Sequence, residues 1–393
     1  MGTIIKKFVN YIKDDNNISI SWVRILYNLI YSKQSVIRSL VDVGSCKNDI
    51  IEKFYSDTVY TSHLPKVTLE DDRKIKMNVP SVSLFYFKDA VVNIDSTSIL
   101  YKDKIVVTRT DEERFNEGFL SCHNQYYGKV FYEKITDLEE GFFLGGNGSW
   151  NWFHFIIEIL PKLMLLQPNT TKTLLVSEIV LKIPSMTKAL DYIKNENYNI
   201  LYLKRNQSYH VKKLYYVNDF NHIQFNRFDH LIKGEGTYYK KELTCRYSDV
   251  LINQIPSINH SPSYLFLYRK NTHRIANNQE EILEFLKPYG FTPICMEELS
   301  FEEQVNYFKN AKFIIGISGA AWTNLLFCRN SPKAICFLTS NAAEASAFSN
   351  LASLFNVNLL HLLYENDENH YSSNFEINLS QFKSLFKSLL NEK

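Results

Sequence analysis

The sequence predicts an α/β protein with two Rossmann-like domains that face each other across a cleft, preceded by a helical and β-rich extension. The chain has 393 residues, of which 45% are hydrophobic, so it can bury the cores of two domains of about 100 to 200 residues each. From residue 173 onward, short apolar runs alternate with amphipathic runs, a pattern typical of βα units around a parallel sheet. A polar linker between Pro256 and Pro262 divides these units into two sets. We therefore expect three parts, at 1–79, 80–255 and 256–393.

The extension is predicted to be helical over residues 1–60. Residues 1–40 carry six basic and two acidic side chains. Two interpretations stay open: the apolar face of this helix packs on the body of the protein, or it lies on an anionic membrane surface. Five apolar residues recur there at helical spacing, namely Trp22, Ile25, Leu26, Leu29 and Ile30.

From about Pro80 the sequence changes to short runs rich in aromatic and β-branched residues, separated by Asp, Gly and Ser. These runs predict hairpins that feed into a sheet. They are SLFYF, AVVNI, KIVVTR, KVFYEKI and GFFLGG.

The segment 145–166 reads as a glycine-rich loop followed by a helix. His154 and Glu158 are four residues apart, so they lie on one face of that helix, and Pro161 should interrupt it. A histidine and a carboxylate are costly to bury in apolar surroundings unless they are paired. Two readings stay open for the pair, a structural brace for the loop and a role in proton transfer.

The second domain carries the clearest pattern, at residues 311–327. An unbroken apolar run predicts a strand covered on both faces, and small residues around Gly319 then let the chain turn into a helix. Arg269 and Arg274 follow the first strand of this domain, so both can point towards the same turn. Two guanidinium groups facing a helix N-terminus favour an anion site, although an ordinary strand-to-helix joint has similar residues. The other helices expected here are 279–286, 300–308, 342–355 and a final amphipathic one.

Several classes of protein are disfavoured. The net charge of +2 demands no nucleic acid partner, and six cysteines without CxxC spacing indicate neither a zinc site nor a disulfide framework. No apolar run reaches the length of about 18 residues needed to span a membrane, and no signal peptide is evident. We expect a protein of the reducing cytoplasm. An NAD-dependent enzyme is disfavoured because GxGxxG with a downstream acid is absent.

Residues 264–327 resemble the catalytic domain of glycosyltransferase family 61, formerly a domain of unknown function found in capsular polysaccharide biosynthesis proteins. The shared features are an arginine that ends the first strand, an R-x-I-x-N loop, LKPYGF, SFxEQV and GxxxTNLLF. An upstream segment resembles the family's His, acidic residue and Leu-Pro-Arg-Leu. The matching residues are Arg269, Arg274, Ile275, Asn277, Gly290, Ser300, Gln304, Gly319, Thr323 and Asn324, and upstream Phe153, His154, Glu158, Leu160, Pro161, Lys162 and Leu163.

Three positions depart from the family pattern. Ser318-Gly319-Ala320-Ala321 replaces the usual His-Gly-Ala-Gly, and Glu158 stands where Asp is common. Cys336 stands where the family often has an acid, a role that Glu344 could take.

The resemblance implies a GT-B-like enzyme that transfers a sugar with inversion from a nucleotide sugar to a hydroxyl of a glycan or lipid-linked glycan. It implies surface polysaccharide biosynthesis, capsular or lipopolysaccharide, in the cytoplasm or at the inner membrane face. The domain at 80–255 would hold the acceptor and that at 256–393 the donor. No cofactor and no metal are expected. The alternatives are another GT-B-like enzyme, such as a polysaccharide pyruvyl transferase, and a catalytically silent carbohydrate-binding or scaffold protein.

The implied site has a base, a donor set and an acceptor loop. Glu158 is the expected base, with His154 as its orienting partner or as the alternate base. The expected donor-binding residues are Arg269, Arg274, Asn277, Ser318, Gly319, Ala320, Thr323, Asn324 and Glu344. The expected acceptor loop holds Gly146, Asn147 and Trp152.

Overall fold

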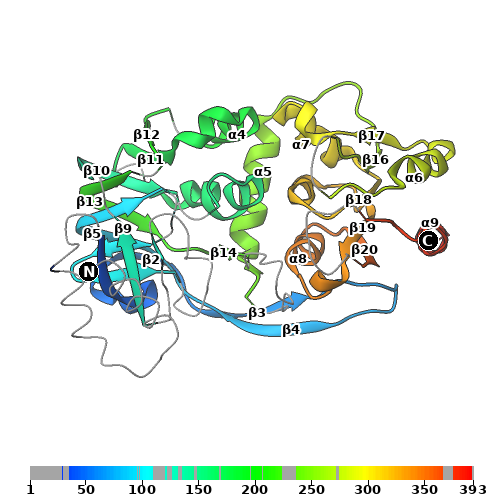
Figure 1. The fold of residues 1–393 in the computed structure, drawn as a ribbon. Helices are drawn as coiled ribbons and strands as arrows, with labels where there is room; N and C mark the ends of the chain where they lie inside the picture. Colours follow the sequence, from blue (N-terminus) through cyan, green and yellow to red (C-terminus); the bar gives the residue numbers. More distant parts are fainter. Residues whose placement is uncertain are drawn as a thin grey trace, which may run out of the picture.

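The computed structural model confirms an α/β architecture, with two large sheets and helices between and beside them (Figure 1). The description covers residues 29, 35–94, 96, 98–108, 120–121, 126–131, 135–145, 148–167, 170–194, 196–205, 207–223, 236–270, 274–365 and 375–391.

The first half of the molecule is built on an eleven-stranded mixed sheet. Its strand order is β12-β11-β10-β13-β5-β6-β7-β1-β9-β8, and β2 pairs with β5 outside this path. The neighbouring strands β12, β11, β10 and β13 are parallel, whereas β5 is antiparallel to β13. The strands are β1 (Ser35–Asp42), β2 (Ile50–Tyr55), β5 (Val82–Asn93), β6 (Ile99–Tyr101), β7 (Lys104–Val107), β8 (Leu120–Ser121), β9 (Tyr127–Phe131), β10 (Ile135–Leu144), β11 (Thr173–Ser177), β12 (Asn199–Leu203) and β13 (Ser208–Val217).

The prediction of a helical extension is wrong for residues 35–79. This segment forms strands β1 and β2, two short 3-10 turns at Val43–Ser45 and Lys47–Asp49, and a hairpin of β3 (Thr58–His63) and β4 (Lys74–Val79). In β4 half-buried and exposed side chains alternate, a period of two that suits a strand and not a helix. Leu29 is exposed, and the other residues of the predicted apolar stripe, Trp22, Ile25, Leu26 and Ile30, lie outside the described residues.

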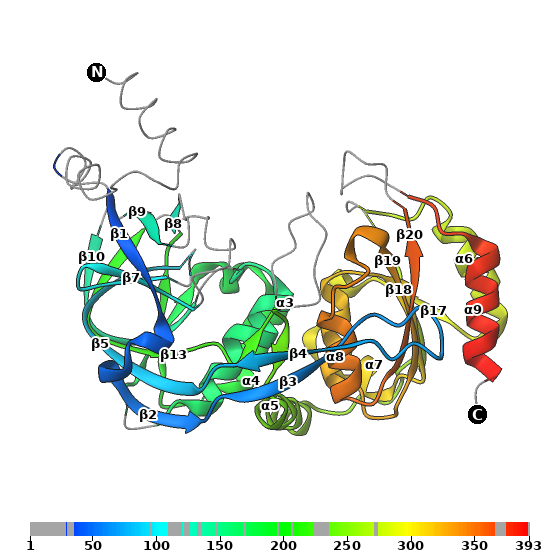
Figure 2. The same ribbon diagram turned by 90° about the horizontal axis from the view of Figure 1, so that it is seen from below.

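The hairpin of β3 and β4, called the arm below, reaches from the first half of the molecule to the second (Figure 2). Asn350 in α8 (Ala347–Leu354) holds it: the Asn350 Oδ1 accepts from the His63 N–H at 2.7 Å, and its Nδ2 donates to Ser62 Oγ at 2.9 Å. Further along, the His361 N–H donates to the Lys66 carbonyl at 2.6 Å. The arm therefore ties the two halves together.

The second half contains the predicted parallel sheet, with the order β17-β16-β18-β19-β20. Figure 2 shows α6 and α9 on one face of this sheet and α7 and α8 on the other. The predicted helix at 342–355 is shorter than expected, because a 3-10 turn at Ser340–Ala342 precedes α8. The strands are β16 (Tyr264–Leu267), β17 (Thr292–Ile294), β18 (Phe313–Ile317), β19 (Lys333–Thr339) and β20 (Asn358–Tyr364), and the helices are α6 (Gln279–Leu286), α7 (Phe301–Asn310) and α9 (Leu379–Asn391).

One apolar core runs through both halves. It includes Phe155 and Leu174 from the first half and Val305, Trp322 and Leu325 from the second. Helices α4 (Pro184–Ile193) and α5 (Lys241–Gln254) lie between the sheets, and α4 packs against α7. The boundaries predicted at residues 79 and 255 stay predictions.

Candidate functional site

The helical segment 152–165 changes its winding twice within four turns. It begins as α3 (Trp152–His154), continues as a π-helix, η4 (Phe155–Ile159), and ends as a 3-10 helix, η5 (Leu160–Leu165). Asn151 caps its start by accepting from the Phe153 N–H at 2.8 Å. The predicted interruption at Pro161 is confirmed, and π-helical turns of this kind are frequent at functional sites.

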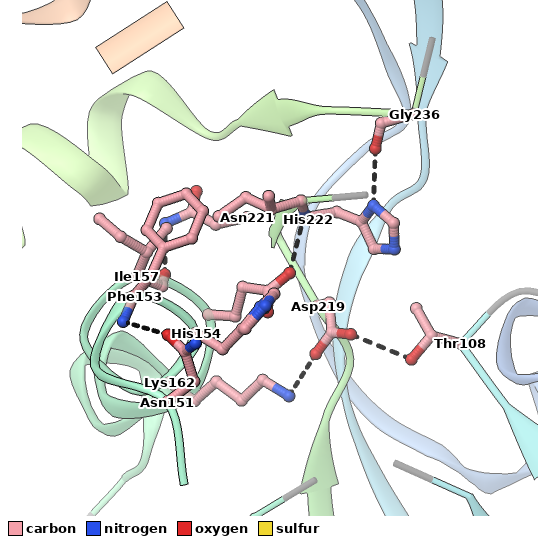
Figure 3. Close-up of polar contacts among 12 residues, drawn as sticks. Thr108, Asn151, Phe153, His154, Ile157, Lys162, Asp219, Asn221, His222 and Gly236 are labelled. Carbon is pink, nitrogen blue, oxygen red and sulfur yellow. Dashed lines mark hydrogen bonds and ion pairs between the residues drawn. The ribbon is translucent and has the colours of Figure 1, made fainter. Parts of the chain in front are cut away.

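Pro161 also explains an unusual contact of this helix. Because proline has no N–H, it cannot donate to the Ile157 carbonyl four residues earlier. The Asn221 side chain donates to that carbonyl instead, at 2.9 Å (Figure 3). Asn221 belongs to the short strand β14 (Asn221–His222), which pairs with β15 (Tyr238–Tyr239). A second chain segment thus replaces the hydrogen bond that the helix lost.

His154 and Glu158 lie on one face of this helix, as predicted, and they form a buried pair. His154 Nδ1 is 2.6 Å from Glu158 Oε2, and the other carboxylate oxygen accepts from the Ile223 N–H at 2.8 Å. The two residues are only 5% and 3% exposed. Both oxygens of Glu158 are therefore engaged, and the carboxylate fixes the orientation of the imidazole ring.

Gly148 is the glycine that the loop before this helix requires. Its φ is +83°, and a Cβ built there would lie 2.7 Å from His154 Cγ. The loop backbone thus presses against the imidazole ring. Gly146 and Asn147, predicted to face an acceptor, lie outside the described residues. Trp152 is half-buried and meets the Phe301 ring edge-on at 5.8 Å.

A buried ion pair lies one turn beyond Glu158, and sequence reasoning missed it. Lys162, which is 1% exposed, pairs with Asp219, which is 4% exposed, just after the end of β13. Thr108 Oγ1 donates to the second oxygen of Asp219 at 3.1 Å. The sequence signal was a lysine within an apolar helix; its partner, 57 positions later (219 − 162), follows only from the fold.

The predicted convergence of arginines on the turn after β18 is confirmed. Arg269 Nη2 donates to the Ser318 carbonyl at 2.8 Å. A Cβ on Gly319 would lie 2.1 Å from that nitrogen and 4.0 Å from Arg274 Nη2. The φ of Gly319 is 168°, which is ordinary extended backbone, so this position needs a glycine for space. Both guanidinium groups therefore lie over the turn, at the carboxyl edge of the parallel sheet.

Gln279 holds the backbone of Arg269 and was also missed. Its amide accepts from the Arg269 N–H at 3.0 Å and donates to the Arg269 carbonyl at 3.1 Å. The preceding residue, Asn278, clamps the backbone of Ile377 in the same way, at 3.1 and 2.7 Å. By contrast Asn277, a predicted donor-binding residue, is exposed, and its N–H donates to the Phe375 carbonyl at 2.7 Å. The two consecutive amides at the start of α6 were the available sequence signal.

The remaining predicted donor-binding residues differ in their exposure to solvent. The segment after the turn is a 3-10 helix, η9 (Ala320–Phe327), in which Ala320 is exposed. Thr323 and Asn324 are fully buried in its inner face, and the Asn324 amide donates to Gln304 Oε1 at 3.4 Å. Glu344 is exposed in the turn before α8. A direct role in donor binding stays a prediction for all four residues.

The histidine helix and the arginine turn belong to one region of the molecule. Helix α3 packs against η9. The Phe348 ring joins them, with its centroid 5.4 Å from that of Phe153 and 6.4 Å from that of Trp322. Within the described part of the chain, no helix is long and apolar enough to cross a membrane, and no three His, Cys, Asp or Glu side chains are grouped to hold a metal ion.

Fold and site together define an α/β protein with a buried histidine–glutamate pair beside an arginine-covered turn at the edge of a parallel sheet. The model of the glycosyltransferase 61 family matches residues 152–335 of the chain. This match confirms the resemblance seen in the sequence, and it suggests glycosyltransferase activity. No curated protein matches the chain.

Proposed function

We propose that the protein transfers a sugar, with inversion, from a nucleotide-sugar donor to a hydroxyl of a glycan acceptor, in a GT-B-like arrangement and without a metal ion. The observation that carries the proposal is the pair of guanidinium groups over Gly319. Two cations at the carboxyl edge of a parallel sheet suit a diphosphate, which carries its negative charge on several oxygens. They would stabilise the diphosphate as it leaves.

Proton transfer from the acceptor requires a base beside that diphosphate. Glu158 was the first choice from the sequence, and the geometry favours the alternate assignment. Both Glu158 oxygens accept hydrogen bonds, so the carboxylate is suited to hold the His154 Nδ1–H. The other ring nitrogen, Nε2, would then take the hydroxyl proton while the acceptor oxygen attacks the anomeric carbon and the bond to the diphosphate breaks.

The biological setting proposed is surface polysaccharide synthesis on a glycan or lipid-linked glycan, in the cytoplasm. The support is the family match over residues 152–335. Peripheral membrane contact through the N-terminal segment was one interpretation of its basic charge; residues 1–28 lie outside the described residues.

A panel of nucleotide sugars tests this proposal on the full chain. Melting temperature is measured with each donor, and release of free nucleotide is measured with and without glycan acceptors, in the presence of EDTA. We expect one class of nucleotide sugar to raise the melting temperature, and nucleotide release to increase with an acceptor. Stabilisation by glycans but by no nucleotide or nucleotide sugar would instead support a carbohydrate-binding protein, and strict dependence on added manganese would refute the metal-free proposal.

A further inference from the structure

The buried ion pair of Lys162 and Asp219 lies beside the His154–Glu158 pair, and a contribution to stability alone does not explain why two charges are buried there. Two charges lose their hydration when they are buried, and apolar replacements of such pairs are often neutral or stabilising. Here the pair spans two segments: Lys162 extends from η5 towards Asp219, beyond the end of β13 (Figure 3). It lies one turn from Glu158 on the helix that carries His154.

Both members of the ion pair make further contacts. Thr108 holds one Asp219 oxygen and Lys162 the other, and the Lys162 ammonium lies 4.8 Å from the centroid of the Tyr216 ring. Burial works to lower the pKa of Lys162, but the carboxylate of Asp219, then Tyr216 and Glu158, raise it above its ordinary value. Lys162 is therefore a cation that also interacts with Glu158.

The other titratable groups described near this region include the buried imidazole of His222, in β14, and three phenols. Burial raises the pKa of Tyr216, which lies in β13, and Asp219 raises it further. Burial also raises the pKa of Tyr239 in β15, followed by the effects of Tyr60 in the arm and of Glu158. Burial raises the pKa of Tyr60 as well. Among the described residues that interact with the pair, two carboxylates, at 158 and 219, and one ammonium, at 162, can carry charge.

We propose that Lys162 and Asp219 are positioning residues for the His154–Glu158 pair. The ion pair anchors the helix just after Pro161 and places a positive charge beside Glu158. In this arrangement the Glu158 carboxylate accepts from His154 Nδ1–H, and Nε2 is the basic nitrogen. The role in turnover rests on the proposed function, whereas the state of the imidazole can be measured without any substrate.

The test is NMR titration of the full chain labelled with ¹⁵N-histidine. The His154 signals are assigned by their loss in His154→Gln. In the wild type we expect the proton of the neutral ring on Nδ1. In Lys162→Met/Asp219→Asn, which contains no unpaired buried charge and should fold, we expect the His154 midpoint to differ from the wild-type value by about half a pH unit or more, because the ion pair that anchors the helix and its charges are both lost. In Lys162→Arg, which keeps the charge, the midpoint should stay at the wild-type value.

The matched control is another ion pair, Arg329 with Asp249, whose atoms are 2.8 Å apart and which joins α5 to the end of η9. Arg329→Met/Asp249→Asn should leave the His154 midpoint unchanged. A folded Lys162→Met/Asp219→Asn variant with the wild-type midpoint and tautomer would overturn the proposal. If the midpoint moves as expected while no nucleotide sugar binds the wild type, the positioning role stands and the proposed function fails.

Discussion

At the scale of single residues, two glycines mark the candidate site because each makes room for a side chain of that site. Gly148 lies against the imidazole of His154, and Gly319 lies beneath the guanidinium of Arg269. Gly148 also has a positive φ, which favours glycine. The backbone of Gly319 is extended, so a larger residue is excluded there only by the nearby Arg269 side chain. The backbone is thus shaped around the two groups to which we assign the chemistry.

Arg269→Ala should weaken nucleotide binding, because a hydrogen bond to a charged group contributes about 1.5 to 3 kcal/mol. That range corresponds to a loss of affinity of roughly 10- to 150-fold. The matched control is Lys270→Ala, which removes the neighbouring exposed cation that pairs with Glu298. Calorimetric titration with the nucleotide from the panel gives both affinities. Equal affinity in wild type and a folded Arg269→Ala variant would remove Arg269 from the donor site.

Gly148→Ala should impair turnover beyond any general loss of stability, because the methyl group collides with the His154 ring. Gly290→Ala is the matched control: its φ of +82° is nearly the same as the +83° of Gly148, but nothing lies within 4 Å of the added Cβ. Both variants should lose about 1 kcal/mol or more of unfolding free energy through backbone strain. Only Gly148→Ala should also lose activity. Similar activity in the two variants would show that the contact with His154 has no part in turnover.

At the scale of elements, the parallel sheet of the second half was predictable because its strands are apolar on both faces and are separated by amphipathic helices. The arm was missed because the helical spacing at Trp22–Ile30 was extended over residues whose alternation indicates strands. Thr323 and Asn324 were expected to bind the donor, yet in η9 both side chains are buried in the core. Lys162 and Asp219 could not be paired from sequence, since only the fold brings them together.

The contact between the arm and β20 should make stability depend on pH through His361. Burial lowers the pKa of His361 to about 4, against the opposing effect of its contact with the Lys66 carbonyl. The unfolded chain, with a histidine pKa of about 6.5, then binds more protons than the folded one between about pH 4 and 6.5. The free energy of unfolding therefore does not depend on His361 above about pH 6.5. Below that pH it falls with acidification, by up to about 3 kcal/mol.

Urea unfolding at several pH values measures this effect. His361→Gln should flatten the acid limb of the stability profile. An acid limb that is equally steep in wild type and His361→Gln would assign the effect to other groups.

At the scale of the whole molecule, the two halves are joined by one core, by the arm and by hydrogen bonds from tyrosine hydroxyls. The Tyr192 hydroxyl in α4 donates to Glu302 in α7 at 2.8 Å, and the Tyr239 hydroxyl donates to the Ala347 carbonyl at 2.9 Å. These contacts hold the histidine helix and the arginine turn in one arrangement.

We expect the protein to unfold in a single cooperative transition, because separating the halves would expose the core that they share. Differential scanning calorimetry, with the ratio of calorimetric to van't Hoff enthalpy, measures this directly. Two resolved transitions would indicate that the halves are independent domains, as the sequence-based division at residue 255 supposed.

The central claim is that the His154–Glu158 pair and the arginine turn form one site for sugar transfer, and turnover measured together with nucleotide affinity tests it most directly. His154→Ala should lower kcat by about 10² to 10⁴-fold, the usual contribution of a positioned base, while the nucleotide Kd stays within about threefold of the wild type. Glu158→Gln should retain at least as much turnover as His154→Ala, because it removes the orienting partner and keeps the base. A lower turnover in Glu158→Gln than in His154→Ala would return the role of base to Glu158. Near-normal turnover in both folded variants would contradict the claim.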